Sequence, residues 1–125
     1  MPTTMNEETE TIKVLYLASE AAPLVKVGGL GDVAGSLPVT LRRLNIKNIT
    51  GRQVDVRLVL PFHNAIKEKI NNPLVAAEFN LIVPHGVLPV VVYLTNLADL
   101  PVYLIDGPPI APDNRVYAAD TLLDG

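Results

Sequence analysis

The side chains best suited to chemistry lie in one short segment, where a lysine precedes closely spaced glycines. Residues 26–31, the glycine loop, read Lys-Val-Gly-Gly-Leu-Gly, and Asp-Val follows. Glycines have no Cβ and let a ligand approach the backbone, while Lys26 adds a full positive charge. Where a helix begins in such a loop, its first N–H groups are unpaired and its dipole favours an anion. The segment therefore suits the binding of a phosphate group, although glycines also serve simply to turn a chain between a strand and a helix.

Two well-known phosphate-binding motifs fit this loop poorly. In the P-loop the lysine follows the glycines, whereas Lys26 precedes them. Gly29, Gly31 and Ala34 satisfy the G-x-G-x-x-A pattern of dinucleotide-binding folds. That pattern should follow its strand directly, and an acidic residue should end the next strand. Here the next candidate strand ends at Pro61 without such an acid. We therefore do not expect a nicotinamide or flavin site.

The elements that must position the loop form a predicted β-α-β unit. Residues 12–18 are nearly all apolar and rich in β-formers, which predicts a strand buried on both faces. Residues 54–60 predict a second strand, ended by Pro61, with Val54, Val56, Leu58 and Leu60 on one face. Between them, residues 30–44 carry apolar side chains at steps of three and four, which predicts a helix despite Pro38. The predicted inner stripe of that helix comprises Leu30, Val33, Ala34, Leu37, Leu41 and Leu44. Strand, helix and strand in this order predict a parallel pair joined by a crossover.

The rest of the chain is less regular. Residues 64–71 predict a short helix, and residues 76–83 and 88–95 predict a hairpin across residues 84–86. Residues 102–105 predict another short strand, and the prolines and glycines after Asp106 disfavour regular structure. We expect a disordered leader at residues 1–11 and an incomplete domain at residues 12–125, because no terminal element closes that domain.

Composition excludes several classes of protein. With 125 residues, 49% of them apolar and 18% charged, the chain is a folded domain and not a disordered tail. A formal charge of -3 and only four Tyr and two Phe argue against a nucleic-acid partner. The most apolar stretch, residues 87–94, is shorter than the roughly 20 residues of a membrane helix, so no membrane partner is expected. The lack of cysteine excludes disulfides and thiolate metal sites and favours the cytoplasm.

Other polar residues have simpler interpretations. Asp32 falls in the first turn of the predicted helix, where an acid complements the dipole, so we interpret it as a helix-start residue and not a catalyst. His63 and His85 have no carboxylate or cysteine at ligand spacing, and we expect no metal site.

The glycine loop and its surroundings resemble the lysine-x-Gly-Gly-Leu motif of bacterial glycogen synthases and plant starch synthases, glycosyltransferase family 5. The resemblance extends to residues 18–23, 31–33, 36–38 and 55–61, and further along to residues 102–106 and 116–117. It covers most of residues 12–125. Val27 stands where many bacterial members have threonine, and residues 46–53 look longer than the usual turn, which we interpret as a surface insertion.

The resemblance implies an α/β fold of the GT-B type, in which two Rossmann-like domains face each other across a cleft, with this chain as a partial N-terminal domain. It implies a retaining enzyme, without metal or cofactor, that transfers glucose from ADP-glucose to the non-reducing end of an α-1,4-glucan. Lys26 would contact the donor phosphates, the backbone at Gly28 and Gly29 would approach the donor, and Glu20 would lie near the acceptor. No residue of this chain is expected to be catalytic by itself, and the chain would be inactive without the C-terminal domain. The alternative is a non-catalytic module that binds a nucleotide or a glucan.

Overall fold

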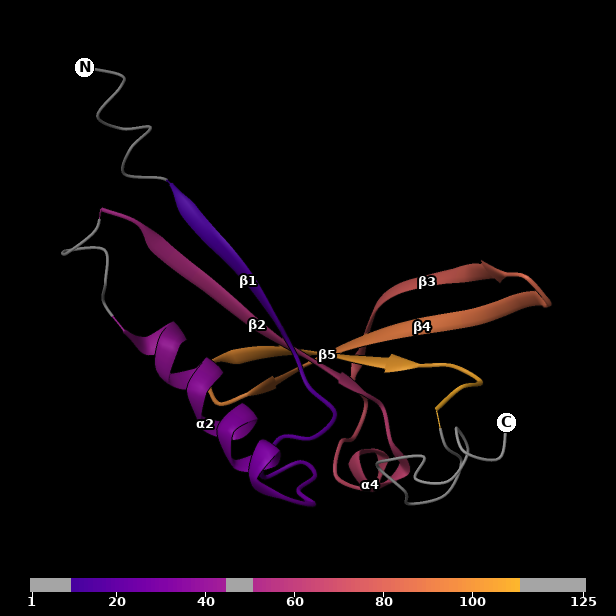
Figure 1. Cartoon of the computed structure of the whole chain (residues 1–125), viewed down its shortest axis with the longest axis horizontal. Coiled ribbons are helices and arrows are strands. Elements are labelled where there is room, and N and C mark those ends of the chain that lie inside the picture. Colours follow the sequence, from indigo (N-terminus) through magenta and orange to yellow (C-terminus); the bar gives the residue numbers. More distant parts are fainter. Residues whose placement is uncertain (1–9, 45–50, 111–125) are drawn as a thin grey trace.

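Within the described residues, five strands form one mixed sheet in the order β1-β2-β5-β4-β3, with two helices beside it (Figure 1). The computed structural model describes residues 10–44 and 51–110. Along the chain the elements are β1 (Thr11–Leu17), α2 (Gly29–Arg43), β2 (Gln53–Pro61), α4 (Asn64–Lys67), β3 (Leu74–Val83), β4 (Gly86–Leu97) and β5 (Leu100–Asp106). Strands β1, β2 and β5 run parallel, while β4 is antiparallel to both β5 and β3. This arrangement confirms the predicted α/β fold class.

The predicted β-α-β unit is confirmed, but the expected burial of its first strand on both faces is wrong. β1 lies at the edge of the sheet, and most of its side chains are exposed. β1 pairs in parallel with β2, from Thr11 opposite Gln53 to Leu17 opposite Val59. α2 connects the two strands and continues through Pro38. Two of these residues correct the predicted boundaries: Thr11 was placed in the leader and Gln53 in the insertion, yet both belong to paired strands. Residues 1–9 of the leader and 46–50 of the insertion lie outside the described residues.

The core lies where β2 and β5 meet the helices and the loop after β1. The predicted inner face of residues 54–60 is confirmed, because Val56, Leu58 and Leu60 are fully buried while Val54 is half-buried against them. β5 contributes the alternating residues Leu100, Val102 and Leu104, and α4 and the loop contribute Ile66, Ala21, Leu24 and Val25. Central parallel strands are buried in this way because helices and loops cover them.

The contact face predicted for α2 is wrong in part. Its buried residues are Gly31, Ala34 and Pro38. The larger side chains of the predicted stripe, Leu30, Val33, Leu37 and Leu44, are instead 41–51% exposed. The reason is close packing: a Cβ on Gly35 would lie 2.3 Å from the Ala22 carbonyl oxygen. A helix that approaches a loop this closely must do so through small residues, so its bulkier side chains lie at the flank of the contact.

An arginine joins the C-terminal turn of α2 to the sheet. Arg42 donates to Asp55 Oδ1 at 2.6 Å and to the Val56 carbonyl at 2.8 Å. Asp55 also pairs with Arg57 at 3.3 Å, and Arg57 in turn donates to the Tyr103 hydroxyl. The hydrogen bonds from Arg42 and then Arg57 lower the pKa of Asp55 below its ordinary value. This network ties the end of the crossover helix to β2 and β5.

The second half of the chain forms the predicted hairpin and the predicted last strand. β3 and β4 are longer than expected, and the turn between them consists of Pro84 and His85. The hairpin joins the same sheet through β4, in which Tyr93 lies opposite Leu104 of β5, and it extends away from α2 (Figure 1). α4 ends at Lys67, short of the predicted residue 71. Neither helix within the described ranges has the length and apolar character needed to cross a membrane.

Candidate functional site

The carboxyl ends of the parallel strands and the first turn of α2 surround a cavity of about 420 Å³. Ligands of open α/β sheets bind at this edge. The cavity walls are mostly apolar and come from the ends of β1, β2 and β5, from α2 and from the segment after β5. Its lining residues are Leu17, Ala18, Ser19, Leu30, Val59, Leu60, Pro61, Ile105 and Ile110. Leu30 belongs to the glycine loop, so the cavity adjoins the residues that the sequence singled out.

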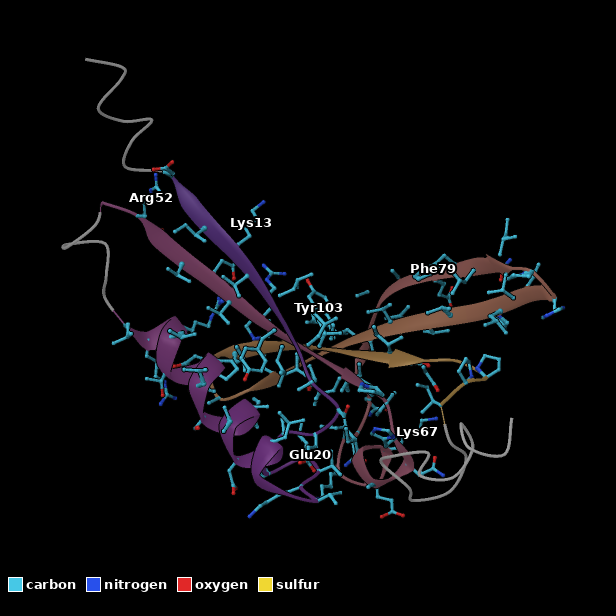
Figure 2. The ribbon with its side chains drawn as sticks, in the orientation of Figure 1. Lys13, Glu20, Arg52, Lys67, Phe79 and Tyr103 are labelled. Atoms are coloured by element: carbon cyan, nitrogen blue, oxygen red, sulfur yellow. The ribbon has the colours of Figure 1, made fainter. Side chains whose placement is uncertain are left out.

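Glu20 is buried at the centre of the glycine loop, beside the N-terminal turn of α2 (Figure 2). Its carboxylate accepts the backbone N–H of Val27. It also accepts the N–H of Gly28 at 3.1 and 3.2 Å and that of Gly31 at 2.9 Å. Gly31 is the third residue of α2, so a side chain eleven positions earlier caps this helix. The loop and the helix start are therefore built around an internal carboxylate.

This arrangement overturns one expectation from the sequence. The amides of the glycine loop were expected to be unpaired and to face a phosphate, but those of Val27, Gly28 and Gly31 are bonded to Glu20. The physical reason is that a helix N-terminus attracts any anion, and the protein supplies one itself. The backbone of Gly29 is not covered by neighbouring atoms, because a Cβ placed on it would meet no atom within 4 Å. The space in front of Gly29 thus remains open to a ligand.

Lys26 is the first residue of the glycine loop, and its side chain lies on the surface and pairs with Asp32. Its Nζ lies 3.1 Å from Asp32 Oδ2, and the two side chains are 51% and 60% exposed. An exposed pair of this kind contributes at most about 1 kcal/mol of stability. Asp32 sits in the first turn of α2, as predicted, and is also the partner of Lys26. The Lys26 ammonium can therefore leave Asp32 and pair with a bound anion at little cost in free energy.

Residues 21–25, which precede the glycine loop, are held by two further sets of hydrogen bonds. Ala21 and Val25 exchange two backbone hydrogen bonds of 2.9 and 3.0 Å, and the Ala22 N–H donates to the Gly31 carbonyl at 2.9 Å. From the side of α4, the Lys69 ammonium donates to the carbonyls of Pro23 and Leu24 at 2.9 and 2.8 Å. These contacts fix the path of the chain from β1 to α2.

Sequence reasoning missed three residues at this edge of the sheet. Lys67, labelled in Figure 2, is the last residue of α4. It pairs with Asp106 at the end of β5, with 3.1 Å between Nζ and Oδ2. Lys69 holds the loop after β1, as described above. Lys69 lies in the turn after α4. The residues around the two lysines show no distinctive spacing, and their partners are far away in the sequence. No local signal could have identified these pairs.

His63 follows β2 and is only 5% exposed. Neither ring nitrogen has a hydrogen-bond partner among the described residues. The Ser19 backbone nevertheless affects the pKa of the ring. Burial lowers the pKa of His63 below its ordinary value of 6.5, and the Ser19 backbone, which raises the pKa, is the weaker cause. His85 lies apart, on the exposed hairpin turn. Within residues 10–44 and 51–110, no group of three or more His, Asp or Glu side chains comes together to hold a metal.

The buried His63 predicts that the chain loses stability as the pH falls below about 6.5. There the unfolded chain binds a proton at His63 more readily than the folded chain, so the free energy of unfolding decreases with falling pH. The slope from this group is at most about 1.4 kcal/mol per pH unit. Urea unfolding at pH 7.5 and 5.5 measures the loss, and His63→Leu should reduce it. An equal loss in the variant would exclude His63 as the cause.

Comparisons with known proteins match nearly the whole chain. The family model described as the starch synthase catalytic domain matches residues 13–124. The glycogen synthase of Histophilus somni is 43% identical over 97 residues, which are 78% of this chain and 18% of that protein. Glycogen synthase 1 of Synechocystis sp. is 35% identical over 116 residues, 87% of this chain and 21% of that protein. The chain thus spans about a fifth of the length of these relatives.

A solved structure supports the same assignment at the level of the fold. The catalytic domain of starch synthase IV from Arabidopsis thaliana, bound to ADP and acarbose, matches with a TM-score of 0.50. The identity is 21%, over 88% of this chain and 21% of that chain. This likeness agrees with a partial N-terminal domain of the GT-B type. The chain belongs to the starch synthase catalytic domain family, the glycogen and starch synthases of glycosyltransferase family 5.

Proposed function

We propose that this chain is the N-terminal part of a cytoplasmic glycogen or starch synthase, which transfers glucose from ADP-glucose to the non-reducing end of an α-1,4-glucan. The observation that carries the proposal is the family match over residues 13–124, which includes the whole glycine loop. In this reaction the bond between glucose C1 and the diphosphate breaks with retention of configuration. C1 bonds to the oxygen of the acceptor hydroxyl, ADP leaves with the electron pair of the broken bond, and the hydroxyl proton is released to water.

Lys26 and Gly29 are the proposed contacts with the donor. The ammonium of Lys26 would leave Asp32 and meet the diphosphate, where positive charge stabilises the departing ADP as its negative charge develops. Gly29 leaves room for the donor to approach the backbone. Gly28 supports the loop through its bond to Glu20. Neither contact requires a metal or an organic cofactor.

The 125-residue chain by itself is expected to be inactive. It spans about a fifth of the named glycogen synthases, and a GT-B enzyme binds its donor between two domains. The proposed partner of this chain is therefore the C-terminal domain, joined to it in a longer polypeptide. Without that domain the cavity beside the glycine loop is open on one side, and the donor lacks most of its contacts.

A transfer assay tests the proposal. Radiolabelled ADP-glucose and glycogen are incubated with the 125-residue chain and, separately, with the longer polypeptide encoded by the same gene. Label is expected to enter glycogen only with the longer polypeptide. Turnover by the short chain would overturn its role as a fragment. A longer polypeptide that binds ADP-glucose but transfers none would instead support a non-catalytic binding module.

A further inference from the structure

We propose that Glu20 is a positioning residue: its carboxylate holds the glycine loop in the shape that presents Lys26, and it touches neither the donor nor the glucan. The kinetic consequence of this inference rests on the proposed glucosyl transfer, whereas its structural basis does not. Backbone N–H groups of Val27, Gly28 and Gly31 converge on this one side chain, which is 1% exposed. The loop is folded around the carboxylate.

Both oxygens of Glu20 are engaged within the loop. Oε1 accepts from Gly28 and Gly31, and Oε2 accepts from Val27 and Gly28. A substrate hydroxyl could reach the carboxylate only by displacing these amides. Buried N–H groups that lose their acceptor are costly, so direct contact with a substrate is the less favourable arrangement. The carboxylate also fills the anion site at the start of α2, which directs a diphosphate to Lys26 instead.

The position of Lys26 depends on the loop that Glu20 holds. Lys26 immediately precedes Val27, and its partner Asp32 immediately follows Gly31, so the bonded amides lie between the two charged residues. A Cβ on Gly31 would lie 3.0 Å from Lys26 Cγ and 3.3 Å from Glu20 Cδ. The stem of Lys26 and the carboxyl group of Glu20 therefore pack against the same glycine. We therefore expect a change in how Glu20 bonds the loop to shift the backbone and Cγ of Lys26.

Amide hydrogen exchange in the 125-residue chain tests the structural part. Glu20→Gln is nearly isosteric but places an NH₂ donor against three N–H donors. We expect the amides of Val27 and Gly28 to exchange roughly 10-fold faster or more. Gly31 should respond less, because its N–H also donates to the Gly28 carbonyl at 3.1 Å. The core amides of Leu58 and Val102 should keep their protection. Glu78→Gln, on exposed strand β3, is the matched control and should change none of these rates.

Kinetics of the longer synthase test the positioning role. Glu20→Gln is expected to lower kcat/KM for ADP-glucose roughly 10-fold while the KM for glycogen stays unchanged. In a Lys26→Ala background the same substitution should have little further effect, because Glu20 acts through Lys26. Additive losses, or a raised KM for glycogen with an unchanged KM for ADP-glucose, would show that Glu20 touches a substrate and would overturn the proposal.

The two measurements fail separately. If the longer polypeptide transfers no glucose, the proposed function fails, yet faster exchange at Val27 and Gly28 still supports the role of Glu20 in holding the loop. Unchanged exchange at these amides overturns that role whatever the enzyme does. If Glu20→Gln also exposes Leu58 and Val102, Glu20→Asp replaces it, since aspartate keeps two acceptor oxygens and adds no donor. Its shorter side chain should then speed exchange at Val27 and Gly28 while Leu58 and Val102 keep their protection; unchanged exchange at both amides would again overturn the proposal.

Discussion

Replacing Lys26 by alanine in the longer synthase is expected to lower kcat/KM for ADP-glucose by about 10- to 150-fold, or about 1.5–3 kcal/mol of transition-state stabilisation. This is the scale of one charged hydrogen bond to the departing diphosphate. The Lys26 side chain is half exposed, and its ion-pair partner within the described residues is the equally exposed Asp32, so its ammonium can move to the donor at little cost. Initial rates with radiolabelled ADP-glucose, at saturating glycogen, provide the measurement.

Two further variants separate a role in transfer from a role in the fold. Asp32→Asn breaks the same ion pair but keeps the lysine, and it should leave kcat/KM unchanged or raise it slightly. Lys13→Ala removes an exposed lysine on β1 and should have no effect. If Asp32→Asn reduced the rate as much as Lys26→Ala, the lysine would act through its ion pair and not through the donor. An unchanged rate for Lys26→Ala would remove it from the site.

Most of the fold could be predicted because its signals are local. The alternation of Val56, Leu58 and Leu60 and the spacing along α2 follow directly from the periods of strands and helices. The order of the strands could not be predicted in the same way, since the pairing of β4 with β5 depends on contacts between segments. The buried face of α2 was predicted wrongly in part, because the spacing of apolar residues does not show which edge of the apolar stripe contacts the rest of the chain. Only the approach of Gly35 to Ala22 determines that.

The site at the glycine loop stays a prediction, whereas the expected unpaired amides of the loop are contradicted by its internal bonding to Glu20. A lysine and glycines before a helix indicate an anion site, and an anion does occupy the loop. That anion is Glu20, eleven residues before the amide of Gly31. A carboxylate at such a distance shows no helical or strand spacing relative to the loop, so its return into the loop depends on the path of residues 21–25. Tertiary contacts such as those of Lys69 determine that path.

Replacing Gly35 by alanine is expected to lower the free energy of unfolding by about 2–3 kcal/mol. The added Cβ would lie 2.3 Å from the Ala22 carbonyl oxygen and 3.0 Å from the Ala22 nitrogen. These are backbone atoms that cannot rotate away, so the helix or the loop has to move. The expected loss already includes the gain of up to about 1 kcal/mol that alanine gives over glycine inside a helix. Urea unfolding of the chain, followed by circular dichroism, measures the change.

Gly29→Ala is the matched control, because it makes the same substitution in the same helix where a Cβ meets no atom within 4 Å. Its free energy of unfolding should stay within about 0.5 kcal/mol of the parent chain or rise. The difference between the two variants therefore isolates the contact of α2 with Ala22. That contact also aligns the Ala22 N–H with the Gly31 carbonyl, so Gly35→Ala should speed amide exchange at Ala22, whereas Gly29→Ala should not. Equal stabilities of the two variants would mean that α2 does not pack this closely against the loop. Steric contact would then not explain why residue 35 is a glycine.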